Sequence, residues 1–321
     1  KPFRRNRKTT SYAGGNLFLL FNSILDKINL GGGIMDPKLF EALNKFMGEK
    51  KPKSIDDVNQ LMQEFTLLYN SGKLNYEYSS KVEAYELLEK AKEAKSEKEE
   101  IKLVKKALEV DPDCVEAKII LAINQDDFMM VYHDLEQALE EEKARLQKLG
   151  FFAKENIGHF YGIFETREYI KAMNSLARIY ANDGLIGKAI KLAKEILRLN
   201  ENDNTGVRYL LMGLYAYMED YSSMKKLYNK YSEENLFMLV PFMIYYFKQA
   251  KYDEAEKYLD RIKKVNKNFV SYFENMEDYD DDFPPYYSIG DISEVKTVSH
   301  ELDFLFITMP NIENFIVEKG K

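Results

Sequence analysis

The chain has 321 residues, of which 45% are hydrophobic, so it can bury one large core or two modest ones. Its formal net charge of −7 argues against general nucleic-acid binding, which needs a basic surface. Cys114 is the only cysteine, and the sequence therefore forms no disulfide within itself. This indicates a reducing, cytoplasmic compartment, with Cys114 expected as a small buried hydrophobic residue at the start of a helix.

Residues 1–34 differ in composition from the rest. The first eight residues, KPFRRNRK, carry five positive charges, and glycine-rich stretches bracket the apolar segment NLFLLFNSILDKINL. A basic tail could contact nucleic acid or an acidic membrane surface, but we predict a solvated, poorly ordered tail. No secretory signal is recognised near Leu17–Phe21, and no membrane span is expected. The longest apolar run, Leu236–Phe247, has 12 residues, whereas a span needs roughly 20.

Residues 35–72 predict a helical cap before the main body of the chain. Asp36 and Pro37 suit the N-cap and first position of a helix. The acidic stretch Ser54–Asp57 suits the start of a second helix, and Ser71-Gly72 ends it. We expect this pair to cover the first of the repeats that follow.

Residues 73–265 contain helical hairpins at a regular spacing. Four positions recur in the order large, aromatic, small and apolar, first 35 and then 31 residues later. These positions are Leu176, Tyr180, Ala189 and Ala193, then Leu211, Tyr215, Met224 and Tyr228, then Phe242, Tyr246, Ala255 and Leu259. A period near 34 with this order is typical of tetratricopeptide repeats. We therefore predict an all-α fold, a tetratricopeptide-like right-handed superhelix of helical hairpins (an α-solenoid), with helical caps at both ends.

Several details of the repeats follow from local signals. Asn182-Asp183-Gly184 should end one helix, with Gly184 in the left-handed position. An earlier hairpin aligns Leu87, Ala91 and Ala107 with the repeat positions, and Pro112 follows it. Residues 115–123 predict a helix, and Val131–Leu149 predict a long charged helix whose charges form a solvated face.

Residues 266–321 predict an acidic loop and a C-terminal helical cap. Six carboxylates lie between Glu274 and Asp282, but their spacing lacks the EF-hand pattern, so we interpret them as a solvated loop and not a cation site. Pro284–Tyr287 matches the PPxY ligand of WW domains, a short match that we attribute to chance. Ile292–Phe306 predicts one amphipathic helix, and Pro310–Ile312 begins a short terminal one.

Two motifs carry a family resemblance. Glu165–Ala172 reads ETREYIKA and Asn202–Leu211 reads NDNTGVRYLL, and one hairpin separates them. This arrangement resembles bacterial tetratricopeptide-repeat proteins of unassigned function, which carry ETRxYMRA and NDNxGVRYLL. The segment from Asn266 through Gly290-Asp291 is similar to the C-terminal part of the suppression of tumorigenicity 7 family. The resemblance covers about residues 74–310 and implies a repeat fold, with no established activity.

The sequence predicts neither an enzyme nor a cofactor. His133, His159 and His300 lie far apart, and none belongs to HExxH or to a zinc-ligand spacing. No GxSxG nucleophile motif is present. We therefore expect no catalytic residue and no metal ligand.

The candidate binding site is a polar set near the two motifs. Arg167 and Arg208 lie near the starts of helices in neighbouring repeats, so they could pair with a buried Glu165 or clamp a carboxylate from outside. The candidate residues are His159, Glu165, Arg167, Tyr169, Asn204 and Arg208.

Two functions remain open on the sequence. The first is a non-enzymatic scaffold that binds a protein or peptide in a concave groove, where tyrosines such as Tyr180 and Tyr215 either line the groove or belong to the core. The second is a regulatory or sensor module that binds a small acidic ligand through Arg167 and Arg208. The oligomeric state stays open.

Overall fold

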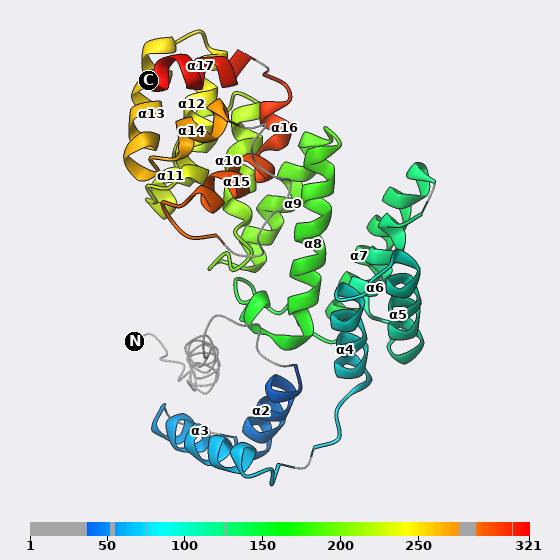
Figure 1. Ribbon diagram of the computed structural model, residues 1–321. Coiled ribbons are helices and arrows are strands. Elements are labelled where there is room, and N and C mark those ends of the chain that lie inside the picture. The colour runs from blue at the N-terminus through cyan, green and yellow to red at the C-terminus, as the bar shows by residue number, and fades with distance from the viewer. Residues whose placement is uncertain (1–36, 52–54, 75, 126, 276–286, 310) are drawn as a thin grey trace, which may run out of the picture. The chain divides into compact units, whose positions relative to one another are not determined.

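A computed structural model describes residues 37–51, 55–74, 76–125, 127–275, 287–309 and 311–321. Across these ranges the chain is all-α and contains no β-strand (Figure 1). The predicted N-terminal tail (1–34), most of the acidic segment at 274–282 and Pro284–Pro285 of the PPxY match lie outside the described residues. None of the described helices is both long and apolar enough to cross a membrane.

Contacts divide the chain into two compact units, Lys1–Ala172 and Met173–Lys321. The boundary falls inside one helix, α8 (Phe164–Asn182), within the predicted repeat region 73–265. The first unit contains α2 (Pro37–Lys50), α3 (Ile55–Asn70), α4 (Ser80–Lys92), α5 (Glu97–Val110), α6 (Val115–Ile123), α7 (Phe128–Lys148) and the 3-10 turn η1 (Phe160–Gly162). The second contains α9 (Ile186–Leu199), α10 (Val207–Tyr217), α11 (Tyr221–Tyr231), α12 (Leu236–Lys248), α13 (Tyr252–Val265), α14 (Phe269–Glu274), α15 (Ile292–Glu301), α16 (Asp303–Phe306) and α17 (Asn311–Gly320).

Helices α2 and α3 begin where the sequence predicted. They share a core that includes Leu43, Phe46, Val58 and Phe65, all at most 3% exposed. A polar contact joins this pair to α4, because the carboxylate of Glu41 accepts hydrogen bonds from the backbone N–H and the hydroxyl of Ser79, at 3.0 and 2.7 Å. Ser79 is the N-cap residue of α4, so the α2–α3 pair holds the start of the next hairpin.

Two further hairpins, α4–α5 and α6–α7, follow in the first unit. Alanines lie at their closest approaches: Ala84, Ala107 and Ala117 are fully buried and let helix backbones come near one another. The predicted helix at 115–123 is present as α6. The long charged helix begins at Phe128, three residues before its predicted start.

Three hairpin turns in the second unit have the same geometry. In each, a residue of positive φ ends the first helix: Gly184 (+74°), Glu219 (+57°) and Ala250 (+53°). The next backbone N–H then donates to the carbonyl of a tyrosine five residues earlier, Tyr180, Tyr215 or Tyr246, at 2.7 to 3.0 Å. This is the Schellman arrangement of a helix C-terminus. This arrangement recurs at the spacings of the sequence repeat. The turns that end α8, α10 and α12 are therefore structurally equivalent.

Five of the six residues at the last two repeat positions are buried. Ala189, Ala193, Met224, Ala255 and Leu259 are all 0% exposed, whereas Tyr228 is half-buried. Tyr180 is 4% exposed, which places this ring in the core and not on a binding surface. Tyr215 is half-buried.

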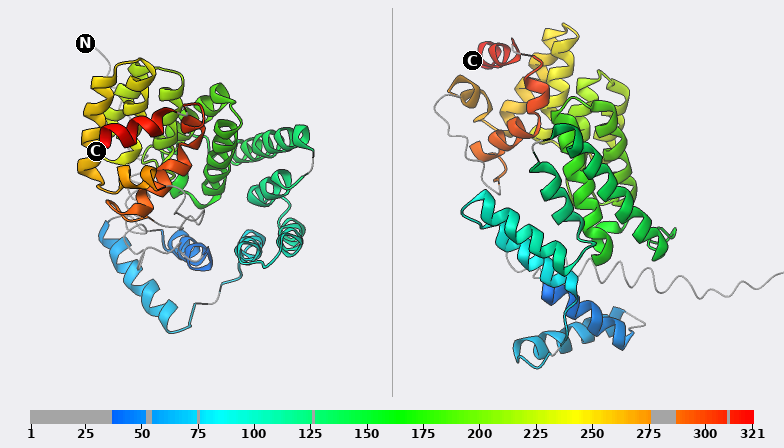
Figure 2. Two further views of the ribbon diagram at one scale, coloured as in Figure 1. Left: turned by 45° about the horizontal axis from the view of Figure 1, so that its top comes forward. Right: turned by 90° about the vertical axis from the view of Figure 1, so that its right-hand side faces the viewer.

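The C-terminal helices pack back onto earlier hairpins. Helix α16 contacts α10, α15 contacts α12, and α17 contacts α13 and α14. Both views of Figure 2 show these helices, coloured orange and red, against the other helices of the second unit. The prediction of one helix from Ile292 to Phe306 is wrong, because the helix breaks at Leu302. Leu302, Phe304, Leu305 and Phe306 are all buried, and one straight helix would spread these neighbours around its circumference.

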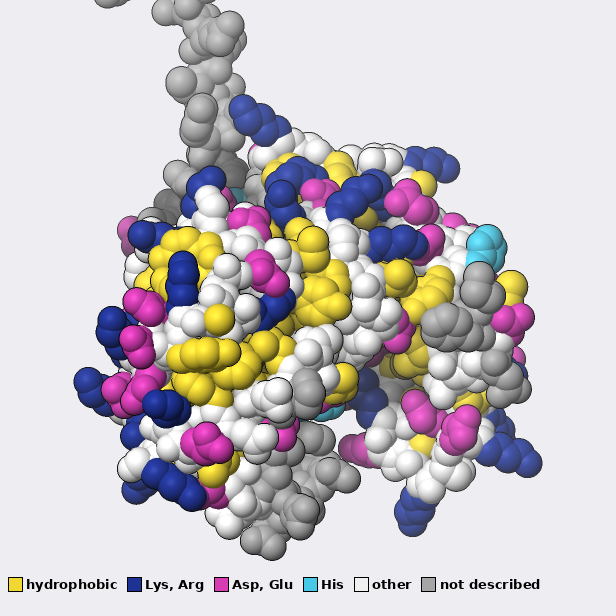
Figure 3. All heavy atoms as spheres, turned by 90° about the horizontal axis from the view of Figure 1, so that it is seen from above, with side chains coloured by type: hydrophobic (Ala, Val, Ile, Leu, Met, Phe, Trp, Pro, Cys, Tyr) yellow, Lys and Arg dark blue, Asp and Glu magenta, His cyan; other side chains and the backbone are white. Residues whose placement is uncertain are grey.

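On the face of the molecule shown in Figure 3, hydrophobic side chains form patches that lysine, arginine and acidic side chains separate. Helix α12 is almost wholly apolar, with residues 236–244 all buried. The second unit is therefore organised around α12, whose neighbours include α10, α11, α13 and α15.

Candidate functional site

The six candidate residues fall in both units. His159, Glu165, Arg167 and Tyr169 belong to the first unit, whereas Asn204 and Arg208 belong to the second. His159 is half-exposed and directly precedes η1, and Asn204 is exposed in the segment before α10.

The structure corrects the expected role of Glu165. A buried Glu165 is one of the two partners that the sequence offers for the arginines, but the Glu165 side chain is exposed on the first turn of α8. Its carbonyl oxygen accepts a hydrogen bond from Nζ of Lys81 at 3.3 Å. An acidic residue in the first turn of a helix is stabilised there by the helix dipole, and this position requires no partner.

Arg167 and Tyr169 have local contacts within the first unit. The Nε of Arg167 donates to the carbonyl oxygen of Tyr161 at 2.9 Å, and its guanidinium lies 5.2 Å from the centre of the Tyr161 ring. Tyr169 is only 4% exposed, and its ring packs edge-on against Phe152 at 6.3 Å. These contacts fix the turn that leads into α8.

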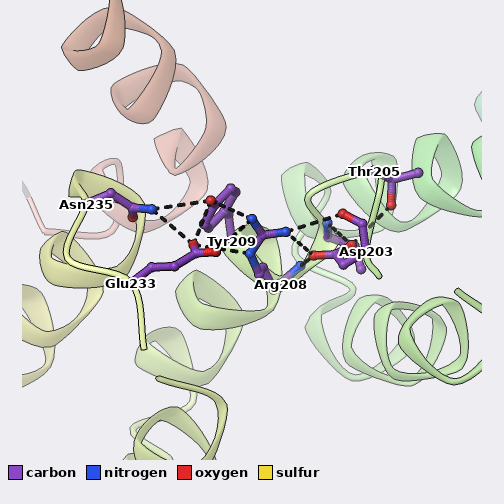
Figure 4. A network of polar contacts seen from close by, with 7 residues as sticks. Asp203, Thr205, Arg208, Tyr209, Glu233 and Asn235 are labelled. Atoms are coloured by element: carbon purple, nitrogen blue, oxygen red, sulfur yellow. Dashed lines mark hydrogen bonds and ion pairs between the residues drawn. The ribbon is translucent and has the colours of Figure 1, made fainter. Parts of the chain in front are cut away.

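Arg208, in contrast, lies at the centre of a polar network in the second unit (Figure 4). Its Nη1 donates to Oδ2 of Asp203 at 2.9 Å, and its Nη2 donates to Oε1 of Glu233 at 3.1 Å. A further bond at 2.7 Å joins Nη2 to the hydroxyl of Tyr209. The guanidinium carbon also lies 4.2 Å from the Tyr209 ring centre and 5.1 Å from that of Tyr231. Arg208 is thus a carboxylate clamp whose carboxylates come from its own chain.

Asp203 is held by the segment that precedes α10. Its side chain is fully buried, and its two oxygens accept from the backbone N–H groups of Val207 and Arg208 at 2.8 and 2.9 Å. Asp203 thereby caps α10, a role that carboxylates favour at a helix N-terminus. The residue adopts a positive φ of +49°, so the loop geometry aims the carboxylate back at the helix.

Glu233 joins this network to the next hairpin. It lies in the link between α11 and α12 and accepts from the Tyr209 hydroxyl at 2.8 Å and from the amide of Asn235 at 3.1 Å. Asn235 in turn caps α12 by accepting from the backbone N–H of Met238. One arginine therefore connects the caps of α10 and α12 (Figure 4).

The protonation states agree with a fixed ion network. Burial disfavours the charged guanidinium, but hydrogen bonds to Asp203 and Glu233 and the charges around it outweigh this effect and raise the pKa of Arg208. Burial and the hydrogen bond to Glu233 raise the pKa of Tyr209 to about 12. Burial and the charge of Asp203 raise the pKa of Tyr231 to about 12. At neutral pH the arginine stays charged and both tyrosines stay protonated.

Sequence reasoning missed Asp203, Glu233 and Asn235 as partners of Arg208. A signal existed for two of them, because Asp203 and Asn235 are residue types that cap helices and each precedes an apolar run. Glu233 is 25 residues from Arg208 and gave no such signal.

The first unit contains an open groove that the sequence did not indicate. It has a volume of about 540 Å³ and lies among α5, α6 and α7. Ile101, Leu108, Leu121 and Ala138 give it apolar lining. Charged and polar side chains share that lining, including Lys105, Lys118, Asp134, Gln137 and Glu141.

Contacts around this groove fix its shape. Lys118 and Glu141 form an ion pair at 2.8 Å between α6 and α7. The amide of Gln125 donates to Asp134 at 2.8 Å, which holds the link between these helices against α7. The amide of Gln137 donates to Glu141 at 2.8 Å.

The arrangement offers no activated nucleophile at Cys114. Burial raises the pKa of the Cys114 thiol to about 11, so the thiol stays protonated and weakly reactive at neutral pH. Among the described residues, no group of three or more His, Cys, Asp and Glu side chains could hold a metal ion.

Comparison of the chain with protein-family models and with curated proteins finds no match. The resemblance to bacterial tetratricopeptide-repeat proteins and to the suppression of tumorigenicity 7 family therefore stays a prediction.

Proposed function

We propose that this protein is a non-enzymatic, tetratricopeptide-type scaffold that binds a peptide segment of a partner protein. The observation that carries the proposal is the 540 Å³ groove among α5, α6 and α7. Its volume falls within the range of about 300–1,000 Å³ that is usual for ligand sites. The equivalent hairpin turns of the second unit support the repeat architecture that such scaffolds use.

The lining of the groove defines the kind of peptide that fits. Apolar side chains from α5, α6 and α7 can receive one or two apolar side chains of a partner. The exposed ammonium of Lys105 at the groove can pair with an acidic residue of the same peptide. We therefore propose an apolar segment with an adjacent carboxylate as the ligand.

The alternative of a small acidic ligand bound by Arg167 and Arg208 has less support. Asp203 and Glu233 already neutralise Arg208, and Asp203 is fully buried. An external carboxylate would have to displace one of them and leave its charge without the arginine, at a large free-energy cost. A reducing, cytoplasmic compartment remains part of the proposal because Cys114 is the only cysteine.

A peptide selection tests the proposal. The full chain is used to select binders from a random peptide library, and the dissociation constant of the best peptide is measured for three proteins. Lys105→Glu reverses a charge at the groove, whereas Lys106→Glu reverses that of the next residue of α5, which is equally exposed and does not line the groove.

We expect binding to Lys105→Glu to be at least tenfold weaker than to the wild type, about 1.4 kcal/mol, and binding to Lys106→Glu to be nearly unchanged. Equal losses in both variants would indicate a general charge effect and contradict the groove. Failure to select any peptide would also contradict the proposal.

A further inference from the structure

A second, more enclosed cavity lies in the first unit, separate from the groove. It has a volume of about 130 Å³ and is lined by α4, the link between α5 and α6, and the helices α6, α7 and α8. Five carboxyl side chains line it, against two basic ones, Lys81 and Arg145. The carboxyl side chains are Asp111, Asp113, Glu116, Glu142 and Glu168. Acidic side chains therefore outnumber basic ones in the lining itself.

Two of these carboxyl groups, Glu116 of α6 and Glu168 of α8, face each other. Each has one oxygen bound to a lysine: Lys92 lies 3.4 Å from Oε1 of Glu116, and Lys171 lies 3.0 Å from Oε1 of Glu168. The other oxygen of each, Oε2, is buried and receives no hydrogen bond from a donor in the described chain. A buried carboxylate oxygen without a donor is costly, so each of these atoms requires a hydrogen.

The two basic side chains of the cavity lining have other partners. Arg145 binds both oxygens of Glu142 at 2.7 Å. Lys81 donates to the carbonyl oxygen of Glu165 at 3.3 Å. The requirement for a donor is therefore concentrated at Glu116 and Glu168.

In the absence of a ligand, one proton can satisfy the pair. Burial and the charge of Glu168 raise the pKa of Glu116, and its protonated carboxyl can donate a hydrogen bond to Glu168. Burial also disfavours ionisation of Glu168, but the charge of Lys171 and the hydrogen bond from Glu116 outweigh this and lower its pKa. The pair then carries one negative charge beside two lysines.

We propose that this cavity binds a primary ammonium group between Glu116 and Glu168, with release of the proton that the two carboxyl groups share. The ammonium carries three N–H donors, enough to serve both Oε2 atoms at once. Proton and ammonium carry the same charge, so the exchange leaves the net charge of the buried pair unchanged. The proton passes to the solvent buffer.

The size and access of the cavity suit a small amine. A volume of about 130 Å³ exceeds the space that one water requires and admits an ammonium with a short carbon chain. The side chains of Glu116 and Glu168 are 24% and 14% exposed, so the pair is reachable from the surface although both Oε2 atoms are buried. This inference does not depend on the proposed peptide groove, because the residues that line the groove differ from those that line this cavity.

Titration of the full chain with ethylammonium chloride at pH 7, followed by NMR with ¹³C-labelled glutamate carboxyl groups, tests the proposal. We expect saturable binding with a millimolar dissociation constant, since three non-hydrogen atoms limit the affinity. The carboxyl resonance of Glu116 is assigned as the one that is missing from the spectrum of Glu116→Gln. When ethylammonium binds, this resonance should move toward the position of an ionised carboxylate. Tetramethylammonium chloride, which has no N–H donor, should produce neither effect at equal ionic strength.

Variants make the assignment specific. Glu116→Gln imitates the protonated carboxyl, so the protein should fold while ethylammonium binding falls at least tenfold. Glu168→Gln should lower it similarly. Glu140→Gln, an exposed change on α7 outside both this cavity and the groove, should leave binding unchanged. Nα-acetyl-lysine amide, whose side-chain ammonium is free, serves as a second probe. If it binds ten times more tightly than ethylammonium, a lysine side chain is the source of the ammonium.

Two results would overturn the proposal. One is equal binding of ethylammonium and tetramethylammonium, which would show that N–H donors are not recognised. The other is a folded Glu116→Gln protein that retains wild-type affinity.

Discussion

The guanidinium of Arg208 lies 2.9 Å from a carboxylate oxygen of Asp203, a side chain that is fully buried. The same arginine reaches Glu233 in the link before α12 at 3.1 Å. A residue that the sequence offered as a ligand clamp is therefore an internal connection between two hairpins. Its removal should affect the stability of the second unit.

Arg208→Ala should lower the free energy of unfolding by about 3–5 kcal/mol, because it leaves Asp203 buried without its cation. The control is Arg198→Ala, which breaks an exposed pair with Glu195 on α9 and should cost less than about 0.5 kcal/mol. Urea unfolding followed by circular dichroism measures both. Equal, small changes in the two variants would contradict an internal role for Arg208.

The equivalent turns after α8 and α12 allow two substitutions with opposite expected effects on stability. Gly184 and Ala250 both have positive φ, a conformation that costs an alanine roughly 1 kcal/mol and a glycine almost nothing. Gly184→Ala should therefore destabilise the protein by about 1 kcal/mol, and Ala250→Gly should stabilise it by a similar or smaller amount. Nothing lies within 4 Å of a Cβ added at Gly184, so crowding does not confuse the comparison. The same sign for both changes in thermal unfolding would show that the turns are not equivalent.

These two cases show what the sequence could and could not predict. Helix boundaries such as Pro37, Ile55 and Asn311 follow from capping residues and apolar spacing, which are local. The partner of Arg208 at Glu233 and the contact between Glu116 and Glu168 join residues of different hairpins. Charged helical residues usually face solvent, so no local signal indicated that Glu116 and Glu168 meet.

The C-terminal region illustrates the same limit. Its amphipathic spacing predicted one helix, but the packing of Leu302 and Phe304 against α10 favours a break. The carbon added by Gly213→Ala on α10 would lie 2.5 Å from a methyl carbon of Leu302. Such a close approach depends on the partner surface and is not encoded by periodicity.

The Glu116–Glu168 pair predicts a distinctive dependence of stability on pH. The pKa of Glu116 is raised above its ordinary value of 4.5, mainly by burial and then by Glu168. Its contribution to stability is therefore complete below pH 4.5 and is lost as the pH rises through the raised pKa. The groups that face the pair are Lys81, Tyr85, Glu89 and Lys92 of α4, Asp111 and Asp113 of the following link, Glu142 and Arg145 of α7, and Lys171 of α8.

Glu116→Gln cannot ionise, so its stability relative to the wild type should increase as the pH rises from 4.5 through the raised pKa of Glu116. The gain is about 1.4 kcal/mol for each unit by which the pKa is raised. Glu141→Gln should instead be less stable than the wild type by a nearly constant amount above pH 4.5, because hydrogen bonds from Lys118 and Gln137 lower the pKa of Glu141 and its dependence on pH lies below that value. Urea midpoints measured across this pH range decide the question, and a constant difference between Glu116→Gln and the wild type would contradict the shared proton.

The central claim is that a peptide binds the groove among α5, α6 and α7, and hydrogen–deuterium exchange with and without the selected peptide tests it most directly. The account predicts slower exchange of backbone amides in residues 97–148, with little change in residues 173–321. Protection confined to the second unit, or spread evenly over both, would contradict the proposed site.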